Sequence, residues 1–213
     1  MIWKIKVFFL RLMEYILRWP YRLFQFIAWL FWIHRPKGKY VVLRWVVGLI
    51  LKGIDLLPVP LIIETLMDVI KWKTRSMTAD EIKIANSVFG NAINYSLIGM
   101  DPSSWPVKKG RAEAYVSLHT INFNGSIPDR ILIHEMTHIW QYRKHGSLYI
   151  TEALYAQRWG GGYEYGGLEA LKTNAEKGLM AFNFEQQAEI VEDYFRTIDK
   201  TDFEKYVDEI REA

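Results

Sequence analysis

The residues best suited to chemistry form the pentapeptide HEMTH, which runs from His134 to His138. It lies within residues 130–144, where the spacing of apolar residues and a glycine at position 146 predict a helix. Residues four apart share one face of a helix, so both imidazoles can reach a single tetrahedral ion while Glu135 faces the neighbouring coordination position. The spacing predicts a zinc (Zn2+) site with His134 and His138 as ligands and Glu135 as the catalytic residue.

The third ligand is expected to be a carboxylate, because the chain contains no cysteine. Residues 184–189, FEQQAE, offer two candidates on a predicted helix. Glu185 and Glu189 share a face there, so one can bind zinc and the other can orient a ligand histidine. We favour Glu185 as the ligand and Glu189 as the outer carboxylate, with the reverse assignment as the alternative. Glu192 and Asp193 are interpreted as solvated helix charges.

The elements that must position these residues are helices alternating with short strands. Thr78 and Glu81 form a capping box before a helix over 79–89, and similar patterns open helices after Asn183 and at Thr201. Together they predict an α+β fold that is mostly helical, with a small sheet and an apolar helical region before it. Runs of β-forming residues predict strands over 93–98, 114–117 and 120–123, and a further helix is expected over 149–159.

These motifs resemble those of known metallopeptidases. HEMTH followed by FEQQAE looks like the gluzincin pattern, and FEQQAE in particular is similar to the third-ligand helix of the CAAX prenyl protease group, which implies that Glu185 binds zinc. Residues 79–141 resemble the metallopeptidase-like core domain associated with bacterial contractile injection systems. The chain departs from that domain at Glu189, where most relatives have aspartate, and the resemblance does not cover the first third of the chain.

The motif and the resemblance predict a zinc-dependent metallopeptidase that acts on a peptide or protein substrate. Zinc would activate a water molecule, and Glu135 would act as the general base in peptide-bond hydrolysis. We expect the substrate to pair with 120–123 as an edge strand. The alternative is a non-catalytic, zinc-stabilised interaction protein, or a component or effector of a secretion system. The side chains of Tyr163, Tyr165 and His119 are candidates for stabilising the transition state, but we favour a structural or surface role for each and do not assign them as catalytic.

The first third of the chain differs in composition from the rest. Residues 1–75 contain 13 basic and 4 acidic residues, whereas residues 76–213 contain 14 basic and 20 acidic residues. The basic residues are spread thinly among apolar ones, which argues against nucleic-acid binding. We therefore predict two parts, a basic apolar helical region over 1–75 that anchors the protein at a membrane surface, and a zincin-like domain over 76–213. The alternative for 1–75 is a hairpin packed on the second domain or on another copy.

Within the first part, residues 2–18 are expected to form a helix with a narrow polar stripe at Lys4, Arg11 and Arg18, interrupted by Pro20. The apolar runs that follow are too short or too polar for a clean transmembrane helix. The charged residues also argue against a cleaved signal peptide. These features predict a membrane-associated bacterial protein.

Overall fold

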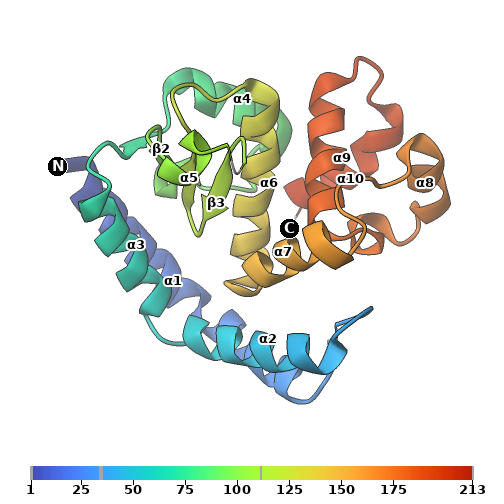
Figure 1. Ribbon diagram of the computed structural model, residues 1–213, viewed down its shortest axis with the longest axis horizontal. Coiled ribbons are helices and arrows are strands. Elements are labelled where there is room, and N and C mark those ends of the chain that lie inside the picture. Colours follow the sequence, from blue (N-terminus) through green and yellow to red (C-terminus); the bar gives the residue numbers. More distant parts are fainter. Residues whose placement is uncertain (1, 34–35, 111, 213) are drawn as a thin grey trace.

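The computed structural model describes residues 2–33, 36–110 and 112–212 and is mostly helical with one four-stranded sheet (Figure 1). The expected mostly helical α+β fold is confirmed. Helix α6 lies in the middle, between the sheet with α4 and a group formed by α8, α9 and α10, while α1 to α3 wrap one side (Figure 1). The helices are α1 (Ile2–Leu30), α2 (Val41–Asp55), α3 (Val59–Ile70), α4 (Ala79–Phe89), α5 (Trp105–Lys108), α6 (Asp129–His145), α7 (Leu148–Trp159), α8 (Gly167–Asn174), α9 (Phe184–Arg196) and α10 (Thr201–Arg211), with short 3-10 turns η1 (Tyr95–Leu97) and η2 (Gly178–Ala181).

The sheet has the order β1-β2-β4-β3, formed by Arg75–Ser76, Gly99–Asp101, Thr120–Asn122 and Tyr115–Ser117 respectively. Strand β4 pairs in parallel with β2 on one side and antiparallel with β3 on the other. The expectation that 120–123 forms the edge strand for substrate is therefore wrong, because both of its edges are already hydrogen bonded. The edge strand on this side is β3.

The strand expected over 93–98 is also wrong, because this segment forms a 3-10 turn before the chain enters the sheet. The Asn94 side chain accepts a hydrogen bond from the amide of Ser96, and the Tyr95 hydroxyl donates to the carbonyl of Gly90 at 2.7 Å. These local hydrogen bonds compete with strand pairing. The strand β2 begins only at Gly99, where pairing partners are available on both sides.

Capping explains where two of the predicted helices begin. The capping boxes at Thr78 and Asn183 are both present, with reciprocal hydrogen bonds to Glu81 and Gln186. The capping box expected at Thr201 is wrong, because this residue is already the first residue of α10 and its amide and hydroxyl donate to the Asp199 carboxylate instead.

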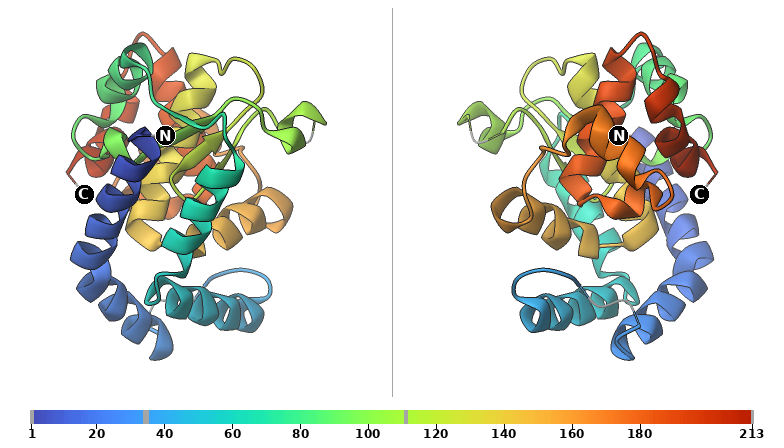
Figure 2. Two further views of the ribbon diagram at one scale, coloured as in Figure 1. Left: turned by 90° about the vertical axis from the view of Figure 1, so that its left-hand side faces the viewer. Right: turned by 90° about the vertical axis from the view of Figure 1, so that its right-hand side faces the viewer.

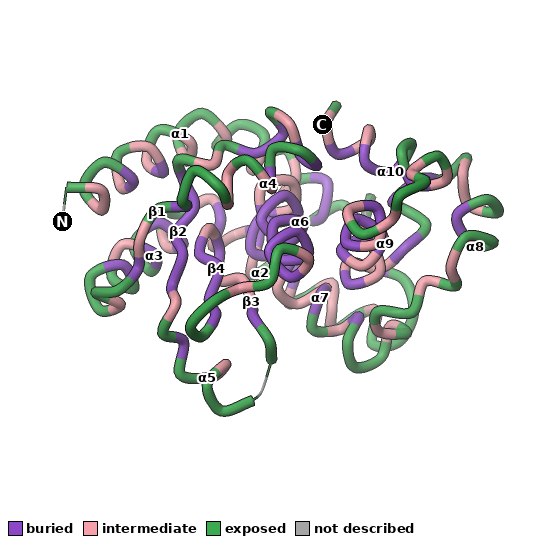
Figure 3. The backbone as a smooth tube through the Cα atoms, turned by 90° about the horizontal axis from the view of Figure 1, so that it is seen from above, coloured by how far each residue is buried: buried purple, intermediate pink, exposed green. Residues whose placement is uncertain are grey.

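Helix α6 is the centre of the core. Residues 131–142 are all buried, and the burial-coloured view shows this helix enclosed by its neighbours (Figure 3). The last carbonyls of a helix need donors from outside it. Arg18 donates to the carbonyl of Arg143 at 2.6 Å and Gln25 to that of Lys144 at 2.7 Å, so side chains of α1 satisfy the end of α6.

Helix α1 continues through Pro20, which contradicts the expected interruption. The proline removes one backbone hydrogen bond on the exposed side of the helix. The side chains of Arg18 and Arg22 on either side of it both donate to carbonyls at the end of α6. Because these tertiary contacts hold both halves against the same neighbour, the helix stays continuous for 29 residues.

The predicted polar stripe of α1 faces the protein interior. The guanidinium of Arg11, 3% exposed, lies 2.7 Å from the Asp68 carboxylate on α3 and donates to the carbonyl of Leu97 at 3.0 Å. Nearby, the Asp55 carboxylate on α2 accepts hydrogen bonds from both the amide and the hydroxyl of Ser147, just before α7. The charges of α1 to α3 thus hold these helices to the domain.

We expect Arg11→Met to lower the free energy of unfolding by about 3–5 kcal/mol, because it leaves the buried Asp68 carboxylate without its partner. Arg75→Gln is the matched control. Arg75 pairs with Glu81 near the surface, so its loss should cost about 1 kcal/mol or less. Chemical denaturation measures both, and equal losses would contradict the central role of the buried pair.

Candidate metal centre

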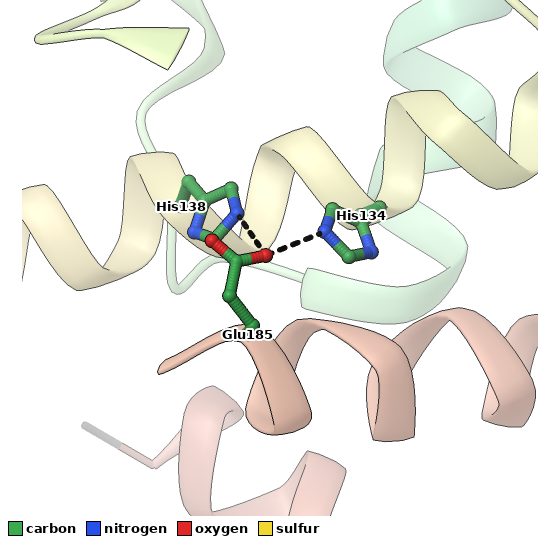
Figure 4. A group of neighbouring side chains, drawn as sticks. All are labelled: His134, His138 and Glu185. Carbon is green, nitrogen blue, oxygen red and sulfur yellow. Dashed lines mark ion pairs between the residues drawn. The ribbon is translucent and has the colours of Figure 1, made fainter. Parts of the chain in front are cut away.

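His134, His138 and Glu185 converge on one point between α6 and α9 (Figure 4). Oε2 of Glu185 lies 3.5 Å from Nε2 of His134 and 3.6 Å from Nε2 of His138. All three residues are buried, and Oε2 of Glu185 has no hydrogen-bond partner. The structure thus brings together the three ligands predicted from the sequence.

The donor set and its spacing fit a zinc ion. Bonds of about 2.0–2.2 Å in a tetrahedral site separate the ligand atoms by roughly 3.3–3.6 Å. The distances from Glu185 to the two imidazoles lie at the upper end of this range. A buried carboxylate oxygen without a hydrogen-bond partner is costly unless a cation compensates it. Two imidazoles and one carboxylate are also a common ligand set of catalytic zinc.

A chain of side-chain amides sets the tautomer of His138. Nε2 of Gln141 donates to the carbonyl of Phe184 at 2.9 Å and to Oε1 of Gln187 at 3.0 Å. Its Oε1 therefore faces Nδ1 of His138, at 2.7 Å, and must accept a hydrogen bond. Since Nδ1 carries the proton, the lone pair of His138 is on Nε2, the atom that faces Glu185.

Glu192 lies behind His134, which contradicts its interpretation as a solvated charge. It is 3% exposed, and its Oε2 is 3.3 Å from Nδ1 of His134 while its Oε1 accepts a hydrogen bond from Arg130 at 3.0 Å. Glu189, the residue predicted for this position, is half-buried with its carboxylate 3.9 Å from the same nitrogen. Glu192 lies one turn deeper along α9 than the sequence pattern favoured, so it is the closer outer carboxylate.

The three candidate ligands are electrostatically coupled. Burial alone would raise the pKa of Glu185, but the facing imidazoles of His134 and His138 outweigh it and lower the pKa to about 2. Burial would lower the pKa of His134, yet the carboxylates of Glu185 and Glu192 raise it to about 10. Without a cation, protons on the imidazoles balance the carboxylates, so metal binding must displace protons.

Glu135 differs from these ligands in its surroundings. It is 6% exposed, its Oε2 has no hydrogen-bond partner, and it lines the same cavity as the three ligands. Burial raises the pKa of Glu135, and the nearby histidines counteract this only in part. A carboxylate whose pKa is raised in this way is a stronger base than one in water.

A cavity of about 610 Å³ opens beside the ligands. The edge strand β3 lines it, with the carbonyl of Val116 accepting a hydrogen bond from the Tyr149 hydroxyl at 2.9 Å. Of the three candidates for stabilising a transition state, Tyr163 lines the cavity. His119 is instead held by Glu64, and Tyr165 donates to Asp193 at 2.7 Å.

Sequence reasoning missed the position of Glu192 and did not identify Gln141 as the residue that contacts His138. Both lie at helical spacing from a ligand, Gln141 three residues after His138 and Glu192 seven residues after Glu185, so their faces were visible in the sequence. The way α6 and α9 cross decides which acidic residue of α9 reaches Nδ1 of His134, and this crossing cannot be read from the sequence.

The chain has sequence similarity to a bacterial secretion protein. No protein-family model matches it, and no solved structure is significantly similar. It is 30% identical over 146 residues to the type VI secretion system spike protein VgrG2b of Pseudomonas aeruginosa. The similarity covers 61% of this chain and 13% of that protein, so the chain spans only a small part of its relative. The expected link to bacterial contractile injection systems is thereby supported at this coarse level.

We expect Glu192→Gln to weaken zinc binding by about 10- to 100-fold, because it removes the charge that orients His134. Glu189→Gln is the matched control on the same helix and should have a smaller effect, since its carboxylate lies farther from the imidazole. Competition with a chromogenic chelator measures both affinities. A larger loss for Glu189→Gln would contradict the assignment of Glu192.

Proposed function

We propose that this protein is a zinc-dependent peptidase that belongs to, or is delivered by, a bacterial secretion apparatus. The observation that carries the peptidase assignment is geometric. Three atoms that could bind a metal face one another in a buried site, and Glu135 lies outside this set at the same cavity, with its Oε2 lacking a hydrogen-bond partner. The similarity to a secretion-system spike protein supports the proposed link to secretion. The proposed catalytic activity rests on the geometry of the site alone.

The proposed reaction is hydrolysis of a peptide bond. A zinc ion held by His134, His138 and Glu185 would lower the pKa of water towards neutrality and polarise a carbonyl group. Glu135 accepts the proton from the attacking water and passes it to the leaving amine. A proton acceptor in this position must lie beside the cation without binding it, and the place of Glu135 at the same cavity, outside the set of candidate ligands, supports this role.

The substrate is proposed to be an extended peptide. Strand β3 is the edge of the sheet, and it lines the cavity next to the ligands. An extended chain could add to this edge as a further strand, with its scissile bond directed towards the metal site. Apolar side chains of α7, Ile150 and Leu154, line the same cavity and suit apolar residues of the substrate.

A second function is favoured by the likeness to a secretion spike protein. The chain would then be a component or cargo of that apparatus, in which zinc stabilises the fold without catalysis. The same metal site serves both functions, so zinc binding does not separate them. The role of Glu135 separates them, because a purely structural site does not need a proton acceptor.

We expect Glu135→Gln to abolish hydrolysis of a mixed peptide library while stoichiometric zinc is retained, because general-base catalysis contributes about 10²- to 10⁴-fold. Glu169→Gln, at an exposed position of α8, is the control and should retain wild-type rates. Mass spectrometry of the products and metal analysis are the measurements. Zinc binding without cleavage by the wild-type protein would support the structural function instead.

We expect Tyr163→Phe to lower kcat by at least about tenfold with little change in KM, since the hydroxyl would stabilise developing negative charge only in the transition state. Steady-state kinetics on a cleaved peptide test this expectation. Tyr165→Phe is the control, because that hydroxyl donates to Asp193. A larger loss for Tyr165→Phe would refute the assignment.

A further inference from the structure

Helices α1 to α3 have an inverted distribution of polar and apolar side chains. Of the 33 large apolar side chains exposed among the described residues, 26 lie between residues 2 and 72. Along α1 they follow the outer side at helical spacing. The outward side chains on α1 include Ile5, Phe9, Met13, Ile16, Phe24 and Ile27.

The polar side chains of the same helices point towards the domain. Arg11 pairs with Asp68, and Asp55 and Glu64 accept hydrogen bonds from the backbone amides of Ser147 and His119. A soluble protein normally turns such charges outward and apolar residues inward. Here the surface formed by α1 to α3 is apolar over a far larger area than scattered surface residues would produce.

The few charges exposed on these helices and their connections are all positive. Among the described residues between 2 and 73, those classed as exposed and ionisable at neutral pH are lysines, namely Lys6, Lys37, Lys39 and Lys73. The acidic residues of this region face inward, with Asp55, Glu64 and Asp68 each no more than 6% exposed. An apolar surface bordered by lysines complements a bilayer that contains anionic lipids.

The contacts of α1 decide how such a surface can meet a bilayer. The helix is about 43 Å long at 1.5 Å per residue, and it contacts the domain from Arg11 to Gln25. It therefore cannot cross a membrane without taking the domain into the hydrocarbon. In Figure 2, left, α1 and α3 lie on one face of the molecule and α2 runs below them.

Among the described residues, no single helix is long and apolar enough to cross a bilayer by itself. Helices α2 and α3 reach the required length and composition only as a pair, and they are bent by 74°. A bent apolar pair is compatible with shallow, re-entrant insertion.

We propose that the outward faces of α1, α2 and α3 insert into one leaflet of a bilayer containing anionic lipids, with the domain kept at the surface. The exposed apolar side chains lie in the acyl region, and the lysines contact the headgroups. The inward charges stay paired, since they already hold α6, α7 and the turn before β4. This inference does not depend on the peptidase activity.

Flotation of the full chain with vesicles tests the proposal. Protein purified in detergent is mixed with vesicles of phosphatidylcholine, alone or with phosphatidylglycerol, and the detergent is removed. We expect wild type to float with both and more strongly with the anionic vesicles. The triple variant Phe9→Glu, Phe24→Glu and Ile63→Glu should reduce the floating fraction at least about tenfold, because it places charges on the inserted surface.

The matched control carries three glutamates on the opposite part of the molecule, at the exposed positions Leu168, Met180 and Ile198, and should float like wild type. Circular dichroism checks that each variant is folded. If the first variant fails to fold, replacing Lys6, Lys37 and Lys39 by glutamine provides a second test. That variant should lose only the additional binding to anionic vesicles.

Two results would overturn the proposal. One is a wild-type protein that stays at the bottom of the gradient with both kinds of vesicle. The other is a vesicle-free oligomer that the Phe9, Phe24 and Ile63 variant converts to a monomer while vesicle binding is unaffected, which would show that a second copy covers this surface. Peptide hydrolysis by the same variants reports on the metal site separately, so failure of one proposal is distinguishable from failure of the other.

Discussion

The site depends on two imidazole nitrogens and one carboxylate oxygen that face each other in a buried space. The carboxylate oxygen has no hydrogen-bond partner. Such an arrangement is costly unless a cation lies between the three atoms. The surrounding structure maintains it. Gln141 and Gln187 hold His138 in one tautomer, and Arg130 holds the carboxylate of Glu192 behind His134. Binding of a cation at this site would therefore be coupled to the packing of α6 against α9.

The helices α1 to α3 also help to position the site. Side chains of α1 supply donors to the last carbonyls of α6, and Asp55 at the end of α2 holds the start of α7. The glycine at 146 has a positive φ of 71°, and a Cβ there would collide with Asp55 and Arg22. The helix that carries the candidate ligands His134 and His138 thus ends against the apolar region, so that region positions the site as well as forming an exposed surface.

Several local signals in the sequence predicted the structure correctly. The capping boxes at Thr78 and Asn183 and the zinc-binding spacing within α6 are local patterns, and the structure contains each of them. Two of the errors arose where distant partners decide. Pro20 does not end α1 because α6 holds both sides of it, and 120–123 is not an edge because β2 and β3 pair with it.

The sequence alone determined which side chains can bind a metal, because a spacing of four residues on a helix places His134 and His138 on one face whatever surrounds them. It also determined that the first third of the chain is basic and apolar. Only the tertiary structure decided that Glu192 lies closer than Glu189 to His134, and that the charges of α1 to α3 point inward. The physical reason is that helix crossings and burial depend on contacts between distant segments, which local spacing does not encode.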